Sequence, residues 1–153
     1  MSQNPERDRT STSPSPFDPA GQRKRYIVLV EDSLSDVHLI RLALAKAKVE
    51  AEIVVFEDGE KAIRFFENGA QTAAECPDLV LLDINLPRAG GKEVIRRLRL
   101  SACREVPVLV MTSSDSAGDR QDMERQGAIG YFRKPSELAE FLKLGEIVRD
   151  LLV

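Results

Sequence analysis

Short apolar runs alternate with segments of helical periodicity from Tyr26 to the end of the chain. The runs are rich in Val, Ile and Leu without strict alternation, which is typical of strands buried on both faces of a parallel sheet. The predicted strands span residues 26–31, 52–56, 78–83, 106–112 and 129–132. The predicted helices span residues 34–48, 59–68, 92–101, 116–126 and 136–152. Five strand–helix units predict an α/β fold, a doubly wound five-stranded parallel sheet covered by five helices.

The first 25 residues differ in composition from the rest of the chain. They hold four of the eight prolines and almost no large apolar side chains. Such a segment cannot bury enough surface to offset the entropy that ordering costs. We therefore expect residues 1–25 to be a disordered tail and residues 26–153 to form one domain.

Charge and cysteine content restrict the classes of function. The chain has 22 basic and 25 acidic side chains, a net charge of -3, which gives no electrostatic reason to expect a DNA or membrane partner. No apolar run approaches the roughly 20 residues of a membrane span, and no secretory signal is recognisable, so we expect a cytoplasmic protein. Cys76 and Cys103 have neither a CxxC partner nor a nearby histidine. Neither a zinc site nor a disulfide scaffold is expected, in keeping with a reducing compartment.

Charged and hydroxyl side chains stand at the carboxyl ends of four predicted strands. Glu31 and Asp32 follow the first strand, and Asp83 ends the third. Thr112 ends the fourth strand and Lys134 follows the fifth. Because these strand ends meet at one edge of a parallel sheet, we expect the side chains to lie together. A carboxylate cluster suits Mg²⁺, and Mg²⁺ with Lys134 would offset the charge of a phosphoryl group accepted by Asp83.

Four sequence blocks carry a family resemblance. They are VLVED at 28–32, LVLLDINLP at 79–87, VLVMTSS at 108–114 and GYFRKP at 130–135. In order and spacing these blocks resemble the receiver domain of two-component response regulators, the CheY-like family. The resemblance implies the strand order 2-1-3-4-5. It also implies a phosphoprotein of a phosphorelay, which takes a phosphoryl group from a histidine kinase onto Asp83 and loses it by slow hydrolysis.

The resemblance also implies roles for residues around Asp83. The implied Mg²⁺ ligands are the side chains of Asp32 and Asp83, the backbone carbonyl of Asn85 and, through water, Glu31. The implied phosphoryl contacts and switch residues are Thr112, Lys134 and Tyr131. The implied kinase-docking residues are Leu34, Ser35, His38, Pro135 and Ser136. Glu31 departs from the pattern because the family more often has Asp there, and we expect its longer side chain to shift metal affinity without abolishing it.

Three further stretches resemble a subgroup of the family. They are EDSLSDVHLIRLAL at 31–44, EDGEKAIRFF at 57–66 and PDLVLLDINLP at 77–87. They are similar to stand-alone bacterial regulators paired with phytochrome-type histidine kinases, which lack an output domain. The resemblance implies a kinase of that type as partner and no role in binding DNA.

The last predicted helix carries two apolar stripes. The stripe suited to packing on the sheet consists of Leu138, Phe141, Leu142, Val148 and Leu152. The second stripe, turned away from the first at 100° per residue, consists of Leu144, Ile147 and Leu151. A second apolar stripe on a surface helix predicts another surface that covers it, and we expect a homodimer.

Two other functions are compatible with parts of this pattern. A phosphatase of the haloacid-dehalogenase type also uses an aspartate nucleophile and Mg²⁺ at a strand end. It needs an acid two residues later, where this chain has Asn85, and an amide cannot relay the proton. The second alternative is an adaptor with a receiver fold that binds its partner without phosphorylation. It predicts that Asp83→Asn leaves binding unchanged.

Overall fold

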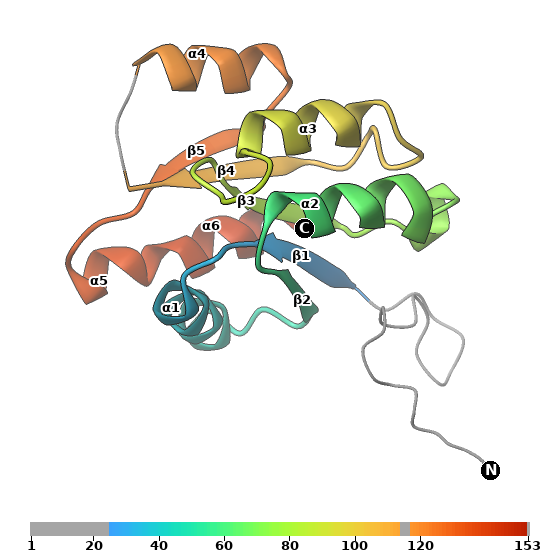
Figure 1. The fold of residues 1–153 in the computed structure, drawn as a ribbon. Coiled ribbons are helices and arrows are strands. Elements are labelled where there is room, and N and C mark those ends of the chain that lie inside the picture. Colours follow the sequence, from blue (N-terminus) through green and yellow to red (C-terminus); the bar gives the residue numbers. More distant parts are fainter. Residues whose placement is uncertain (1–24, 114–116, 153) are drawn as a thin grey trace, which may run out of the picture.

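A five-stranded parallel sheet forms the centre of the protein (Figure 1). The structure is a computed structural model, and it describes residues 25–113 and 117–152. The strands are β1 (Tyr26–Val30), β2 (Glu52–Phe56), β3 (Leu79–Asp83), β4 (Val108–Thr112) and β5 (Gly130–Arg133). Their order is β2-β1-β3-β4-β5, which confirms the doubly wound sheet and the strand order implied by the family resemblance. The disordered tail expected at residues 1–25 falls, except for Arg25, outside the described residues.

Helical segments follow all five strands. They are α1 (Leu34–Lys46), α2 (Gly59–Arg64), the π-helix η2 (Phe65–Gly69), the 3-10 helix η3 (Ala73–Glu75), α3 (Gly91–Arg99), α4 (Ala117–Arg125), α5 (Leu138–Phe141) and α6 (Lys143–Leu151). The last predicted helix is thus divided into α5 and α6. None of the helices in the described ranges combines the length and the apolar character that a membrane crossing requires.

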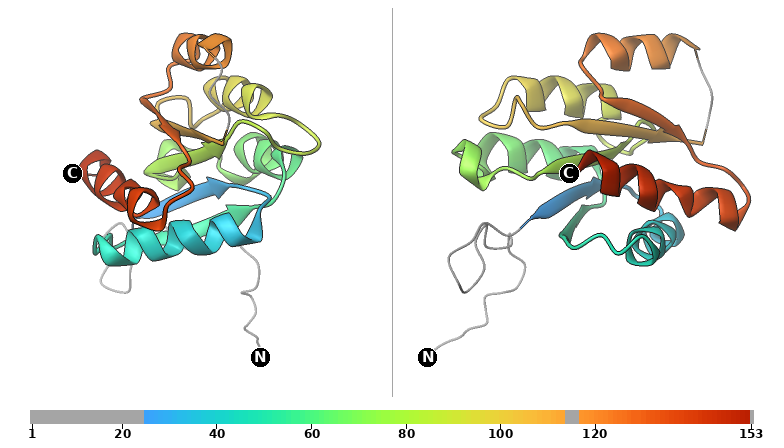
Figure 2. Two further views of the ribbon diagram at one scale, coloured as in Figure 1. Left: turned by 90° about the vertical axis from the view of Figure 1, so that its left-hand side faces the viewer. Right: turned by 180° about the vertical axis from the view of Figure 1, so that it is seen from behind.

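The helices form two layers, with α1, α5 and α6 on one face of the sheet and α2, α3 and α4 on the other (Figure 2). Every residue of β1, β3 and β4 is buried. Alternate residues of these strands pack into two apolar cores, one on each face of the sheet. Ile27 and Leu29 pack beneath α1, while Val28 and Val30 pack beneath α2 and α3. Burial on both faces explains why the apolar runs lack alternation.

The surface expected to form a dimer is partly buried inside the domain. Leu144 has no exposed surface and belongs to the core cluster beneath α1 and α6. Leu151 is half-buried against the same cluster, and Ile147 is 38% exposed. Leu144 is therefore wrong as a dimer contact.

Close packing between α1 and α6 explains this correction. A Cβ added at Gly145 would lie 2.1 Å from the carbonyl oxygen of Ala43, so only glycine lets the two helices approach so closely. Leu144 also lies four residues before Val148 and shares its side of the helix. The buried face thus consists of Phe141, Leu144 and Val148, whereas Leu138, which was expected to pack on the sheet, is 51% exposed.

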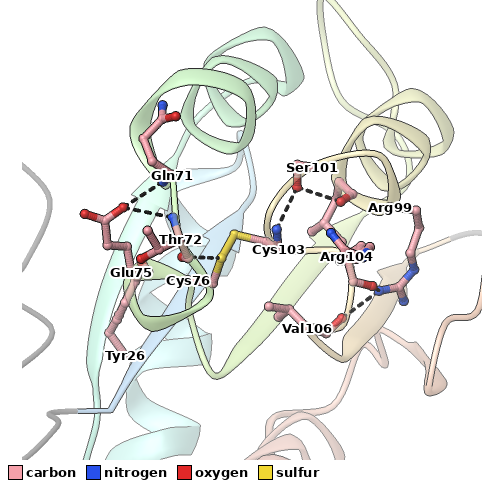
Figure 3. The surroundings of a disulfide bond; sticks show 11 residues. Tyr26, Gln71, Thr72, Glu75, Cys76, Arg99, Ser101, Cys103, Arg104 and Val106 are labelled. Carbon is pink, nitrogen blue, oxygen red and sulfur yellow. Dashed lines mark hydrogen bonds between the residues drawn. A yellow bond between two sulfur atoms is a disulfide. The ribbon is translucent and has the colours of Figure 1, made fainter.

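A disulfide bond joins Cys76 and Cys103, which corrects the expectation of unpaired cysteines (Figure 3). Cys76 lies shortly before β3 and Cys103 shortly before β4. Because β3 pairs with β4, the loops that precede them lie side by side, and the two Cα atoms are 5.5 Å apart. Both cysteines are buried. Their separation of 27 residues gave no sign of pairing because the proximity arises from the order of strands in the sheet.

We predict that this disulfide contributes measurably to stability. Closing a loop of 27 residues reduces the entropy of the unfolded chain, by an amount equivalent to about 3.5 kcal/mol in the chain-entropy description. Urea unfolding with and without reductant should therefore give a lower midpoint for the reduced protein. The double variant Cys76→Ala/Cys103→Ala is the matched control, since its midpoint should not respond to reductant. An unchanged wild-type midpoint under full reduction would contradict the prediction.

Candidate functional site

Four acidic side chains and one lysine meet at the carboxyl edge of the sheet. The Nζ atom of Lys134 lies 2.6 Å from Glu31 Oε1, 2.8 Å from Asp36 Oδ2 and 3.1 Å from Asp83 Oδ2. Asp32 completes the group, next to Glu31 in the chain. The structure thus brings together Glu31, Asp32, Asp83 and Lys134, which the strand ends predicted, and adds Asp36 from the first turn of α1.

Local structure fixes the positions of the acids. Glu31 directly follows β1, and its N–H extends the β1–β2 pairing by donating to the carbonyl of Phe56 at 3.0 Å. Asp83 is the last residue of β3. The loop after it returns closely, since a Cβ on Gly91 would lie 2.8 Å from the carbonyl oxygen of Asp83. A glycine is thus needed where α3 begins beside the strand end.

Thr112 and Asn85 connect Asp83 to the neighbouring strand. The backbone N–H of Asn85 donates to Asp83 Oδ1 at 3.0 Å, and its side-chain amide donates to Thr112 Oγ1 at 3.4 Å. Thr112 is fully buried, and its carbonyl accepts the N–H of Lys134 at 2.7 Å. This last bond extends the β4–β5 pairing by one residue and places Lys134 opposite β3 and β1.

Burial and charge oppose one another at this edge. The side chain of Glu31 has no exposed surface, and that of Lys134 is 7% exposed. Burial, only partly offset by the hydrogen bond from Lys134, raises the pKa of Glu31 to about 7. Burial alone would lower the pKa of Lys134, but hydrogen bonds to Asp36 and Glu31 outweigh it and raise that pKa. One ammonium group is shared by three carboxylates, so a proton on Glu31 relieves part of the excess negative charge.

Three of the acids can offer oxygens to one cation. Glu31, Asp32 and Asp83 each have an oxygen within 4.8 Å of the others, with Asp32 exposed to solvent. Oxygen ligands with an open, solvent-facing side fit Mg²⁺, which keeps several of its waters. The donor set therefore fits a small divalent cation.

The remaining predicted residues lie around this centre. Tyr131 is half-buried on β5, and its ring centroid lies 4.6 Å from the guanidinium carbon of Arg120 on α4. The docking candidates on α1 are exposed; they are Leu34, Ser35 and His38. The candidates after β5, Pro135 and Ser136, line a surface pocket together with residues of α1 and α5.

Asp36 is the site residue that the sequence reasoning missed. It lies in the first turn of α1, where an acidic residue is common because it interacts favourably with the helix dipole. Its N–H donates to Oγ of Ser33, the residue that caps the helix, at 3.3 Å. The available signal was an acid in the first turn of the helix that begins directly after the carboxyl end of β1.

Comparison with known proteins identifies the class defined by this fold and site. Residues 27–145 match the response regulator receiver domain family, and the chain belongs to it. Receiver domains are generally phosphoacceptors that take a phosphoryl group from histidine kinases onto an aspartate, and they are generally not enzymes.

Individual relatives narrow the class. The chain is 33% identical over 122 residues to "Response regulator Rcp1" of Synechocystis sp. (strain ATCC 27184 / PCC 6803 / Kazusa), covering 78% of this chain and 83% of Rcp1. It superposes on the Mn²⁺-bound form of Rcp1 with a TM-score of 0.72 at 28% identity, covering 82% of this chain and 92% of that one. The crystal structure of the phosphorylated cyanobacterial phytochrome response regulator RcpA gives 0.74 at 28% identity, covering 84% and 94%. The described region is thus homologous to Rcp1 and RcpA over most of its length.

Longer proteins match as well. The chain is 34% identical over 116 residues to "Transcriptional regulatory protein TrcR" of Mycobacterium tuberculosis (strain ATCC 25618 / H37Rv), covering 76% of this chain. It spans 42% of the length of TrcR.

We predict that the stability of the protein depends on pH because Glu31 changes its protonation state. The pKa of this group is raised from 4.5 to about 7 on folding. Its stabilising contribution is therefore full below about pH 4.5 and is lost as the pH rises through about 7. In metal-free buffer, the free energy of unfolding of wild type relative to Glu31→Gln should fall by roughly 2 kcal/mol between pH 5 and pH 8. Urea unfolding of both proteins at the two pH values tests this, and parallel pH profiles would contradict it.

Proposed function

We propose that the protein accepts a phosphoryl group on Asp83 from a histidine kinase and releases it by slow hydrolysis. The observation that carries the proposal is the position of Asp83, which shares the Lys134 ammonium with Glu31 and is linked through Asn85 to the buried Thr112. In the transfer, an Asp83 carboxylate oxygen attacks phosphorus, the bond from phosphorus to the histidine nitrogen breaks, and that nitrogen keeps the electron pair. In hydrolysis, water attacks phosphorus and the phosphorus–oxygen bond to Asp83 breaks, which restores the carboxylate and yields inorganic phosphate.

Mg²⁺ is the proposed cation. Asp32 and Asp83 would hold it through their side chains, Asn85 through its backbone carbonyl and Glu31 through water. When bound, the cation neutralises charge on the transferred oxygens. The chain supplies the remaining positive charge through Lys134.

Phosphorylation is proposed to act as a population shift. Thr112 would donate its hydroxyl to a phosphoryl oxygen, and the half-buried ring of Tyr131 would turn inward with it. The contact of Arg120 with the Tyr131 ring links α4 to that movement. The signal would thus reach the α4–β5 side of the domain.

The partner is proposed to be a phytochrome-type histidine kinase. RcpA is named a phytochrome response regulator, and it resembles this chain over most of its length. The docking surface would combine the exposed start of α1, at Leu34, Ser35 and His38, with Pro135 and Ser136. Leu34 is 71% exposed, so its side chain is accessible to a partner at this edge.

A cytoplasmic location is proposed from the kinase partner alone, since the Cys76–Cys103 disulfide removes the argument from unpaired cysteines. The net charge of -3 gives no reason to add a nucleic-acid partner. A homodimer stays a proposal on a smaller surface than first expected, with Ile147 as its most exposed member and Leu144 removed. The alternative is an adaptor that functions without phosphorylation, and the next experiment distinguishes it from a phosphoacceptor.

We predict Mg²⁺-dependent phosphorylation at Asp83. Incubation with acetyl phosphate should add one phosphoryl group to the intact protein only when Mg²⁺ is present, as measured by mass spectrometry. Asp83→Asn should remain unmodified, because its amide is not a nucleophile for phosphorus. Asp78→Asn is a matched control at the opposite end of β3 and should be modified like wild type. An adduct that persists in Asp83→Asn, or no adduct in wild type, would favour the adaptor.

We also predict that kinase docking and phosphoryl chemistry can be separated. The variant Leu34→Ala/His38→Ala should accept the phosphoryl group from a phosphorylated phytochrome-type kinase at least tenfold more slowly, since a few central residues carry most of the binding energy of an interface. Its modification by acetyl phosphate should be unchanged. Leu100→Ala, which removes an equally exposed leucine from the end of α3, is the control and should behave as wild type. Equal loss with both donors would overturn this division of roles.

A further inference from the structure

All three protons of the Lys134 ammonium group are directed at carboxylates. The acceptors are Glu31, Asp36 and Asp83, and the bond to Asp83 is the longest of the three. A cation bound to Asp83 directly and to Glu31 through water competes with this lysine for the negative charge of both carboxylates. Lys134 then needs another partner that the cation does not use.

Asp36 meets that requirement. The three acids whose oxygens converge within 4.8 Å are Glu31, Asp32 and Asp83, and Asp36 is not in that set. Its side chain is 28% exposed and bonds Lys134 at 2.8 Å. Its backbone is fixed in the first turn of α1, where its N–H donates to Ser33 Oγ. The contact between Asp36 and Lys134 is thus independent of the oxygens available to a metal.

We propose that Asp36 is a positioning residue that retains the Lys134 ammonium group when a divalent cation binds Asp83 directly and Glu31 through water. This inference rests on the proposed function and deepens it. With Asp36 present, Lys134 leaves two acceptors to the cation and keeps a charge-assisted hydrogen bond. Without that charge, Lys134 has only Glu31 and Asp83 as ionised partners, and the cation must displace it from both. Asp36 therefore raises cation affinity by acting through Lys134.

The same contact would orient the lysine toward a phosphoryl group. Held by Asp36 at 2.8 Å, the ammonium group stays near Asp83 and has protons left to donate once Glu31 is engaged elsewhere. The lysine side chain has a flexible stem of four carbons, so a fixed acceptor reduces the conformational freedom that is lost on binding.

Isothermal titration of the full chain with MgCl₂ alone tests the inference. Asp36→Asn should bind Mg²⁺ about tenfold more weakly than wild type, the effect expected when a hydrogen bond between charged groups is lost. Glu137→Gln is the matched control, because Glu137 is exposed on the same pocket and loses the same charge without a bond to Lys134. Its affinity should stay within twofold of wild type. Asp36→Ser serves as a second variant if Asp36→Asn does not unfold cooperatively in urea.

A double-mutant cycle tests whether Asp36 changes the Mg²⁺ affinity through Lys134. In the Lys134→Ala background, Asp36→Asn should change Mg²⁺ affinity by less than twofold, because the residue through which it acts is gone. A tenfold loss that persists in this background would overturn the inference, and so would an equal loss in Glu137→Gln. The proposed function fails separately, if wild type binds no Mg²⁺ or if Asp83→Asn binds it as tightly as wild type.

Discussion

One ammonium group shared by three carboxylates is the interaction on which the carboxyl edge of the sheet depends. Lys134 lies within 3.1 Å of oxygens from Glu31, Asp36 and Asp83, and both Lys134 and Glu31 are almost completely withdrawn from solvent. Buried charges lose hydration, and here the negative charges outnumber the positive one. The excess of buried negative charge is unfavourable for the stability of the fold, and a bound cation would reduce it. Burial is the main cause of the raised pKa of Glu31, and the negative charge of Asp83 acts in the same direction.

The position of this cluster depends on contacts at both ends of the strands. The buried strands β1, β3 and β4 bring Glu31, Asp83 and Thr112 to one edge, because their order in space is fixed by packing on both faces. At the opposite edge, the disulfide joins the loops before β3 and β4. Arg99 adds to this edge by donating to the carbonyls of Val106 at 2.8 Å and Gln126 at 3.0 Å. Rigid strand ends are what allow a metal and a phosphoryl group to be placed accurately.

The sequence predicted the features that depend on local pattern. Continuous apolar runs identified the strands, and the polar residue at each strand end identified the edge where chemistry gathers. Features that depend on packing between distant elements could not be predicted in the same way. Cys76 and Cys103 meet because β3 and β4 are neighbours, and Leu144 is buried because Gly145 lets α6 approach α1. Asp36 was overlooked because an acid in the first turn of a helix has an ordinary explanation in the helix dipole.

Thermal unfolding with and without MgCl₂ tests most directly whether the acidic cluster is built to hold a cation. The excess negative charge around Lys134 should make Mg²⁺ raise the Tm of wild type, because a ligand that binds the folded state stabilises it. In Asp83→Asn the excess charge is reduced and one oxygen ligand is lost, so Mg²⁺ should raise Tm far less. An equal rise in both proteins, or no rise in wild type, would contradict a cation site centred on Asp83.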